Sequence, residues 1–81
     1  MNRNIVYVLQ SVPNPSRYYV GRTDYLDVRV AEHNSGLSPH TSHHRPWRLV
    51  VFIQFGNFSK AEAFERYLKS GSGRSFAKRH F

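Results

Sequence analysis

The distribution of apolar and polar positions along the chain predicts three short strands. The unbroken β-branched and aromatic run from Ile5 to Leu9 predicts a buried strand. Two prolines and an asparagine within 13–16 predict a turn, and the segment 17–21 then returns as a second strand and completes a hairpin. The segment 49–55 is the most apolar stretch and predicts the third strand.

The first predicted helix lies between the hairpin and the third strand. Asp24 is a candidate N-cap for a helix over residues 25–35, and Gly36 is the kind of residue that commonly ends a helix in the left-handed conformation. The following segment, 37–46, is rich in His, Ser and Pro, so we expect a loop there.

A second helix is predicted after the third strand. Ser59 and Glu62 have the spacing of a capping box at its start, and Gly71 is the predicted end. A short final helix is expected over 76–81. The order β-β-α-β-α favours an α/β (α+β) fold: one domain over residues 1–81 with a three-stranded, largely antiparallel sheet flanked by helices.

The composition is typical of a small domain in a reducing compartment. The 81 residues allow one domain, and aromatic residues, 15% of the chain, bury a large area per side chain. The absence of cysteine excludes disulfides and Cys-ligated zinc and favours a cytoplasmic location. The apolar run 5–9 is too short for a signal peptide or a membrane span.

The net charge is the first indication of function. Twelve Lys and Arg against five Asp and Glu give a net charge of +7 and a pI near 10.4. Such an excess attracts polyanions, and a soluble basic protein with no polyanionic ligand is the alternative. Membrane-surface binding requires a basic helix with apolar anchors, whereas the helices predicted here direct their apolar faces to the core. We therefore expect nucleic acid as the partner and no membrane.

The predicted hairpin carries two tyrosines that are candidates for chemistry. Side chains alternate across a strand, so Tyr7 and Tyr19 can lie near each other with both hydroxyls on one surface. Gly21 has no side chain and lets a ligand or another part of the chain approach closely. The alternative is that both rings simply belong to the core.

The first predicted helix adds a cation and an imidazole. Leu26 and Val30 mark the face that packs on the sheet, and Arg29 and His33, four residues apart, stack at the edge of that face. A guanidinium and an imidazole in this position can hold a phosphate and assist proton transfer. A solvated helix flank is the alternative interpretation.

Glu65 is the acidic residue of most interest in the second predicted helix. It falls beside the apolar stripe, and a buried carboxylate must be paired, hydrated or bound to a metal. One carboxylate together with water and substrate phosphate suits Mg²⁺. An ordinary ion pair with Lys69, four residues on, is the alternative.

Histidines in the predicted loop raise the possibility of zinc, which the spacing disfavours. His40, His43 and His44 have neither a cysteine nor an acidic residue nearby, and they do not match the usual spacing of zinc ligands. Basic and aromatic residues that follow them favour contact with nucleic acid: Arg45, Trp47 and Arg48.

The ordered set of these residues resembles the GIY-YIG endonuclease family over nearly the whole chain. Ile5-Val6-Tyr7 stands where the family has Gly-Ile-Tyr, and Tyr19-Val20-Gly21 stands for Tyr-Ile-Gly. Arg29 and Glu65 occupy the places of the family's arginine and metal-binding glutamate. The segments 44–50 and 69–74 look like the small single-domain bacterial branch, which is related to the nuclease module of the excision-repair incision subunit.

The resemblance implies a metal-dependent phosphodiesterase with a role such as DNA repair. Tyr7 would act as general base on a water or help a neighbour to do so, with Tyr19 and His33 tuning its proton. Arg29 would hold the scissile phosphate, and Glu65 would bind Mg²⁺ or Mn²⁺. Residues expected to contact nucleic acid are Gly21, Arg22, Arg45, Trp47, Arg48, Lys69 and Arg74. Two departures are Ile5 in place of Gly and the lack of a match to the family's late Asn.

Three functions are therefore open. We expect a divalent-metal-dependent DNA endonuclease, and the alternatives are a non-catalytic nucleic-acid-binding module with the same fold and a protein-interaction domain. A chain of 81 residues leaves no room for a separate targeting domain, so we expect its specificity to come from DNA structure or from a protein partner.

Overall fold

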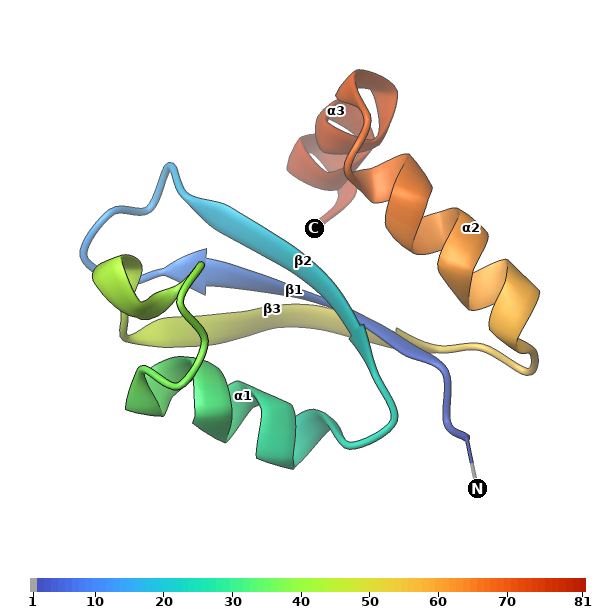
Figure 1. Ribbon diagram of the computed structural model, residues 1–81. Helices are drawn as coiled ribbons and strands as arrows, with labels where there is room; N and C mark the ends of the chain where they lie inside the picture. Colours follow the sequence, from blue (N-terminus) through green and yellow to red (C-terminus); the bar gives the residue numbers. More distant parts are fainter. Residues whose placement is uncertain (1) are drawn as a thin grey trace.

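The computed structural model describes residues 2–81 as three strands, three α-helices and one turn of 3₁₀-helix (Figure 1). In chain order, the elements are β1 (Ile5–Ser11), β2 (Tyr18–Thr23), α1 (Leu26–Ser35), η1 (Ser42–His44), β3 (Trp47–Gln54), α2 (Phe58–Leu68) and α3 (Gly71–His80).

The strands form one antiparallel sheet in the order β2-β1-β3, so β1 lies in the middle. Helix α1 covers one face of the sheet, and α2 with α3 lies over the other (Figure 1). This arrangement confirms the predicted antiparallel sheet flanked by helices. The final helix is longer than expected, and the full order is β-β-α-β-α-α.

Strand β1 divides the core into two parts, because its side chains alternate between the two faces. Val6 and Val8 pack on the side of α2 with Ala61 and Leu68. The side chains of the opposite face pack toward α1 and η1; these are Tyr7, Leu9 and Trp47. Every residue from Ile5 to Leu9 is buried, as the unbroken apolar run predicts for a central strand.

The start of α1 differs from the prediction. Its N-cap is Tyr25, which makes no side-chain capping hydrogen bond. The Asp24 carboxylate accepts hydrogen bonds from the backbone N–H groups of Arg3 and Asn4, at 2.9 and 3.0 Å, and these bonds lower its pKa. Asp24 therefore ties the N-terminal segment to the end of β2. The predicted end is confirmed, since Gly36 has a φ of 85°.

The predicted capping box of α2 and its predicted end are wrong. Asn57 is the N-cap, and its side chain accepts a hydrogen bond from Lys60 N at 2.8 Å. The helix ends at Leu68, and Gly71 begins α3 under a cap from Ser70, whose Oγ accepts from Gly73 N at 3.1 Å. A glycine after a helix can mark its end or the first turn of the next one, and sequence spacing alone does not distinguish them.

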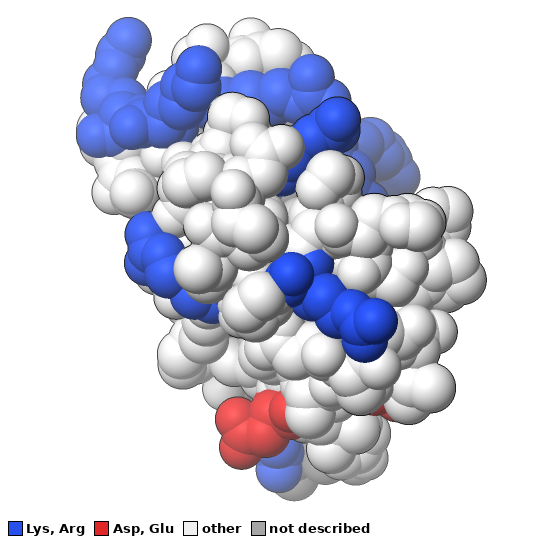
Figure 2. All heavy atoms as spheres, turned by 90° about the vertical axis from the view of Figure 1, so that its left-hand side faces the viewer, with Lys and Arg blue, Asp and Glu red and all other residues white. Residues whose placement is uncertain are grey.

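Figure 2 shows the side of the molecule that lies on the left in Figure 1. Basic side chains are spread over this face, and acidic side chains are visible only in the lower part of the view. Among residues 2–81, no helix combines the length and the apolarity that crossing a membrane requires.

Candidate functional site

Two tyrosine rings from neighbouring strands meet on the α1 face of the sheet. Tyr7 pairs with Gly21 across β1 and β2, and Leu9 pairs with Tyr19. The ring centroids of Tyr7 and Tyr19 are 6.1 Å apart. A Cβ atom on Gly21 would lie 2.5 Å from the Tyr7 Oη, so only glycine leaves room for that hydroxyl. Gly21 itself is buried, which is why the predicted nucleic-acid contact at this residue is wrong.

His33 lies beneath both rings and is fully buried rather than at the rim of the sheet, where sequence periodicity put it. Its Nε2 is 2.8 Å from the Tyr7 Oη, and its Nδ1 is 2.8 Å from the Thr41 Oγ1. The Thr41 hydroxyl donates to the Ser38 carbonyl at 3.4 Å, which leaves the Thr41 oxygen to accept from Nδ1–H. This network assigns the Nδ1–H tautomer, in which Nε2 accepts the proton of Tyr7.

Burial keeps both groups neutral at neutral pH. Removal from water lowers the pKa of His33 below its ordinary 6.5, and the nearby positive charge of Arg29 lowers it further. Burial also raises the pKa of Tyr7 to about 12, with a smaller contribution from Tyr19, while Arg29 acts in the opposite direction. The neutral imidazole therefore accepts a hydrogen bond from Tyr7, and the buried phenol holds its proton tightly.

Arg29 borders the two tyrosine hydroxyls from α1. Its Nη1 donates to the Glu32 carboxylate at 3.1 Å, and this bond is the main reason that its pKa is raised. The nearby hydroxyls of Tyr7 and Tyr19 also raise the pKa of Arg29. Its side chain is 34% exposed, so the guanidinium is accessible to an anion at the edge of the buried group. Helix α1 is anchored as predicted through Leu26 and Val30.

Glu65 occupies a separate position on the other side of edge strand β2. Its Oε1 accepts from Arg22 Nε at 3.2 Å, and its Oε2 accepts from Lys69 Nζ at 3.0 Å. The Arg22 guanidinium also lies 4.4 Å from the centroid of the Phe58 ring. Because side chains alternate along β2, Arg22 faces away from Tyr19. The structure thus brings together Tyr7, Tyr19, Arg29 and His33, and the polar partners of Glu65 are two cations.

A metal ion at Glu65 would take few ligands from the protein. No cluster of three or more His, Cys, Asp or Glu side chains with metal-binding geometry occurs within residues 2–81. The Glu65 side chain is 18% exposed, and its partner Lys69 is 55% exposed, so the pair lies open to exchange with another cation. One accessible carboxylate fits Mg²⁺, which keeps several waters and binds substrate phosphates.

Trp47 was predicted to contact nucleic acid, and the structure contradicts this. It is 5% exposed, packs with Tyr7 and Leu9, and donates its indole N–H to the Thr41 carbonyl at 2.8 Å. The loop before it is held to the sheet, since the Ser11 hydroxyl donates to the His44 carbonyl at 2.6 Å. Sequence pattern did not indicate Thr41, because a buried threonine in a polar loop has no distinguishing spacing.

The other predicted contact residues lie at the surface. Four of them are exposed basic side chains: Arg45, Arg48, Lys69 and Arg74. Arg22 is half-buried beside Glu65. Arg45 lies against Gly36, where its guanidinium occupies the space that a Cβ would take.

Comparison with known proteins places this chain in a family. Residues 3–79 match the GIY-YIG catalytic domain. The "Structure-specific endonuclease subunit SLX1" of Candida dubliniensis is 34% identical over 71 residues, which is 79% of this chain and 25% of that protein. The protein of the same name from Debaryomyces hansenii is 32% identical over 71 residues, covering 79% of this chain and 20% of its own length.

A third protein of that name, from Scheffersomyces stipitis, is 35% identical over 54 residues, or 59% of this chain and 16% of its own. The chain thus spans a quarter or less of the length of these relatives. They are fungal, so they support the family and not its bacterial branch in particular. No solved structure matches. The match over residues 3–79 shows that this chain belongs to the GIY-YIG family.

Proposed function

We propose that the chain is a divalent-metal-dependent endonuclease that hydrolyses DNA phosphodiester bonds. The observation that carries the proposal is the hydrogen-bonded series Tyr7–His33–Thr41, with Arg29 against the tyrosine hydroxyls. A fully buried neutral imidazole that accepts a phenol proton is an arrangement for moving a proton inward from the site.

Burial decides which tyrosine meets the attacking water. Tyr7 is 1% exposed, whereas Tyr19 is half-buried and lies over His33, with 4.7 Å between their ring centroids. Tyr19 therefore accepts the proton of the water and passes its own to Tyr7, whose proton moves to His33 Nε2. The water oxygen forms the new bond to phosphorus, and the bond from phosphorus to the leaving oxygen breaks.

Arg29 and Glu65 complete the proposed site. The accessible guanidinium of Arg29 holds the scissile phosphate and offsets the charge that develops on it. Glu65 would bind Mg²⁺ or Mn²⁺, which when bound stabilises the negative charge on the leaving oxygen. Arg22 fixes the Glu65 carboxylate from β2, and the second partner, Lys69, is exposed, so Glu65 could exchange it for a metal ion.

The relatives support a further proposal on the substrate. Their printed name describes subunits of a structure-specific endonuclease. For this chain we propose, by analogy, recognition of DNA shape rather than sequence, together with a protein partner that adds specificity. A cytoplasmic location, a role in DNA repair and membership of the small single-domain branch are proposed on the sequence alone.

Nicking of supercoiled plasmid tests the function. The chain is expected to nick DNA with Mg²⁺ or Mn²⁺ and not in EDTA. Arg29→Ala and Glu65→Gln are each expected to lower the rate by about 100-fold or more, the usual effect of removing one group that stabilises transition-state charge. Arg79→Ala and Glu62→Gln are matched surface controls and should nick at the wild-type rate.

The alternative function is a nucleic-acid-binding module without catalysis. It predicts salt-sensitive DNA binding by the wild type with no metal-dependent nicking. Unchanged nicking in both Arg29→Ala and Glu65→Gln, with circular dichroism showing folded protein, would refute the proposed site.

A further inference from the structure

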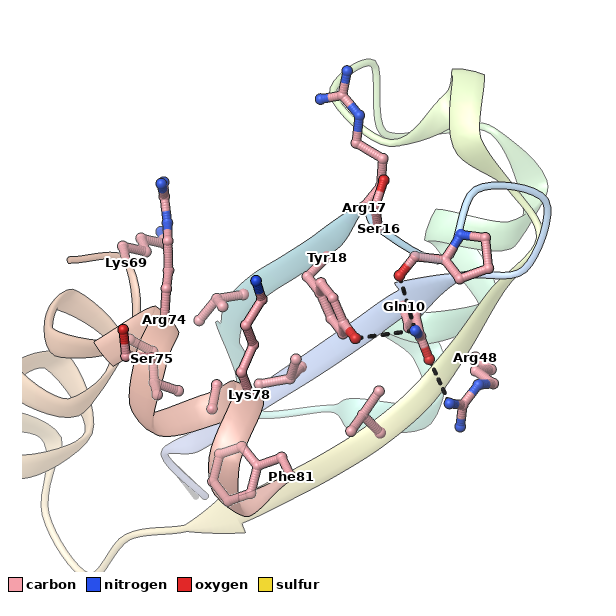
Figure 3. Close-up of a pocket in the computed structure, with 16 residues that line it drawn as sticks. Gln10, Ser16, Arg17, Tyr18, Arg48, Lys69, Arg74, Ser75, Lys78 and Phe81 are labelled. Carbon is pink, nitrogen blue, oxygen red and sulfur yellow. Dashed lines mark hydrogen bonds between the residues drawn. The ribbon is translucent and has the colours of Figure 1, made fainter. Parts of the chain in front are cut away.

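A basic groove lies on the sheet face opposite to Tyr7 and His33 (Figure 3). It encloses about 810 Å³ between α3 and the strands near the turn that joins β1 to β2. Apolar side chains of all three strands form its floor, namely Val8, Val20 and Val50. None of these three floor residues belongs to the proposed nuclease site.

Cationic side chains stand on both sides of the groove. Arg17 comes from the turn before β2, and Arg48 comes from β3. On the opposite side, Lys69 directly follows α2, and Arg74 and Lys78 come from α3 (Figure 3). No Asp or Glu is found among the residues between 2 and 81 that line it. A concave surface with one sign of charge and a low-dielectric floor focuses a positive potential, so the groove favours an anionic chain.

Two aromatic rings are also available to a ligand. Tyr18 is 51% exposed and Phe81 is 38% exposed. The Gln10 Nε2 donates to the Tyr18 hydroxyl at 3.0 Å and to the Pro15 carbonyl at 2.9 Å. Arg48 donates to the Gln10 Oε1, so one amide holds a ring and a guanidinium in place before any ligand arrives.

We propose that this groove binds a single-stranded segment of nucleic acid. Flanking cations would contact the phosphates, and the bases would stack on Tyr18 and Phe81, as in sites that combine a positive groove with aromatic platforms. A duplex presents the same phosphates but keeps its base faces stacked inside, so it cannot use the rings. An acidic peptide would match the charge, but it has no bases to stack.

The groove is continuous with the position of Glu65. Lys69 lines the groove and also donates to Glu65 at 3.0 Å. An unpaired strand that leaves the region of Glu65 can therefore pass Lys69 and enter the groove. The inference deepens the proposed function, because it takes DNA as the ligand and adds an unpaired arm beside the cleaved bond.

Equilibrium binding of a fluorescent 12-nucleotide oligo(dT) in EDTA tests the groove without cleavage. Arg74→Ala/Lys78→Ala is expected to weaken binding by about 25-fold at 0.1 M salt and to reduce the salt slope by about 1.4, because each lost phosphate contact removes about 0.7 of a counterion. Lys60→Ala/Arg79→Ala removes the same charges outside the groove and should change affinity by less than about threefold.

The aromatic contact has its own test. Tyr18→Ala is expected to weaken oligo(dT) binding by about fivefold or more, with little effect on a 12-base-pair blunt duplex. Tyr25→Ala removes an equally exposed ring elsewhere and should leave oligo(dT) binding unchanged. Thermal melting confirms that each variant is folded.

Three outcomes would overturn the inference: equal losses in both double variants, equal losses for oligo(dT) and duplex, or equally good competition by poly-Glu. A failure of the proposed function is seen separately. Binding of oligo(dT) in the groove without any nicking of DNA would support the groove and refute the nuclease. Nicking of DNA without binding of oligo(dT) in the groove would support the nuclease and refute the groove.

Discussion

At the scale of single residues, the core of this domain contains a series of buried polar side chains. An 81-residue domain can bury them without a large loss of stability only because each one has a hydrogen-bond partner. Tyr7, His33 and Thr41 are at most 1% exposed, and each takes part in a hydrogen bond within the series. In the described part of the chain, no buried side-chain nitrogen or oxygen lacks a partner. A fully satisfied network costs little stability, whereas removal of one member leaves another unpaired in a dry environment.

Thr41 provides the sharpest test of this network. Thr41→Val keeps the shape of the side chain but leaves the His33 Nδ1–H without an acceptor, so we expect a loss of about 1–3 kcal/mol in the free energy of unfolding. Nicking should fall by about 10-fold or more, because the imidazole no longer holds Nε2 toward Tyr7. Thr41→Ser restores the hydroxyl and should recover both. Urea unfolding and single-turnover nicking measure the two effects, and wild-type values in Thr41→Val would show that His33 needs no orienting partner.

Gly21 is required for a different reason. In Gly21→Ala the new methyl would lie 2.5 Å from the Tyr7 Oη and 2.9 Å from a Tyr19 ring carbon, so the Tyr7 ring must move. We expect a loss of about 1–3 kcal/mol in stability and the loss of nicking. Gly56→Ala is the matched control, because no atom lies within 4 Å of its added Cβ. Chemical denaturation compares the two, and an equal effect at both positions would contradict this account.

Residue pattern predicted some of these positions and failed at others for a physical reason. Alternation along the hairpin put Tyr7 and Tyr19 on one face, and the structure agrees. Helix periodicity put His33 at a rim, and the basic and aromatic composition of its segment put Trp47 at the surface. Neither kind of pattern shows what covers a side chain. Both residues are buried by the loop 37–46, whose polar composition suggested exposure.

At the scale of elements, the junction of α2 and α3 depends on one close backbone approach. Gly73 lies in the first turn of α3, and a Cβ there would be 1.8 Å from the Tyr67 carbonyl oxygen at the end of α2. Gly73 therefore serves helix packing rather than helix termination. Its neighbour Gly71 has open space around it.

The two glycines make a matched pair for a stability measurement. Gly73→Ala forces α3 away from α2 and from the core that Phe76 and Ala77 join, so we expect a loss of about 2 kcal/mol or more. Gly71→Ala should be neutral or stabilising by up to about 1 kcal/mol, because alanine is favoured in a helix and meets no atom here. Thermal melting of both variants decides the matter, and equal destabilisation would show that helix propensity, not packing, sets the effect.

Helix ends were the least predictable part of the fold. The sequence offers Asp24 as the N-cap of the first helix and Ser59 as the N-cap of the second. In the structure, the N-caps are Tyr25 for α1 and Asn57 for α2. Asp24 is unavailable as a cap because its carboxylate already accepts two backbone N–H groups from the N-terminal segment. This contact joins residues that are distant in the sequence, and it replaces the helix cap that the local sequence predicts. The spacing of nearby residues gives no indication of such a contact.

At the scale of the whole molecule, the sheet separates the residues of the two proposed sites, which alternate along the sequence. The hydrogen-bonded series Tyr7–His33–Thr41 lies under α1, and the basic groove lies under α3, with edge strand β2 and Glu65 between them. The order of elements and the antiparallel sheet followed from hydrophobic pattern. The division of the basic residues between the two faces did not, because it depends on the twist and packing of helices that the pattern does not fix.

Acid stability of the whole domain depends on the neutral state of His33. Its pKa is lowered in the folded protein, whereas the unfolded chain has the ordinary value of 6.5. Below that pH the unfolded state binds more protons than the folded state. The contribution of neutral His33 to the free energy of unfolding is therefore fully present above about pH 6.5 and is lost as the pH falls. The slope is at most about 1.4 kcal/mol per pH unit from this one residue.

Asp24 adds a second acid-sensitive contribution at lower pH, because its lowered pKa makes its stabilisation disappear only below its ordinary value of 3.8. The window between pH 7 and 5 therefore isolates the histidine. Urea unfolding across this window should show declining stability for the wild type and for His40→Gln, while His33→Gln should be less stable at pH 7 but decline much less. A parallel decline in all three proteins would place the acid sensitivity in general charge repulsion and remove the argument for a buried neutral imidazole.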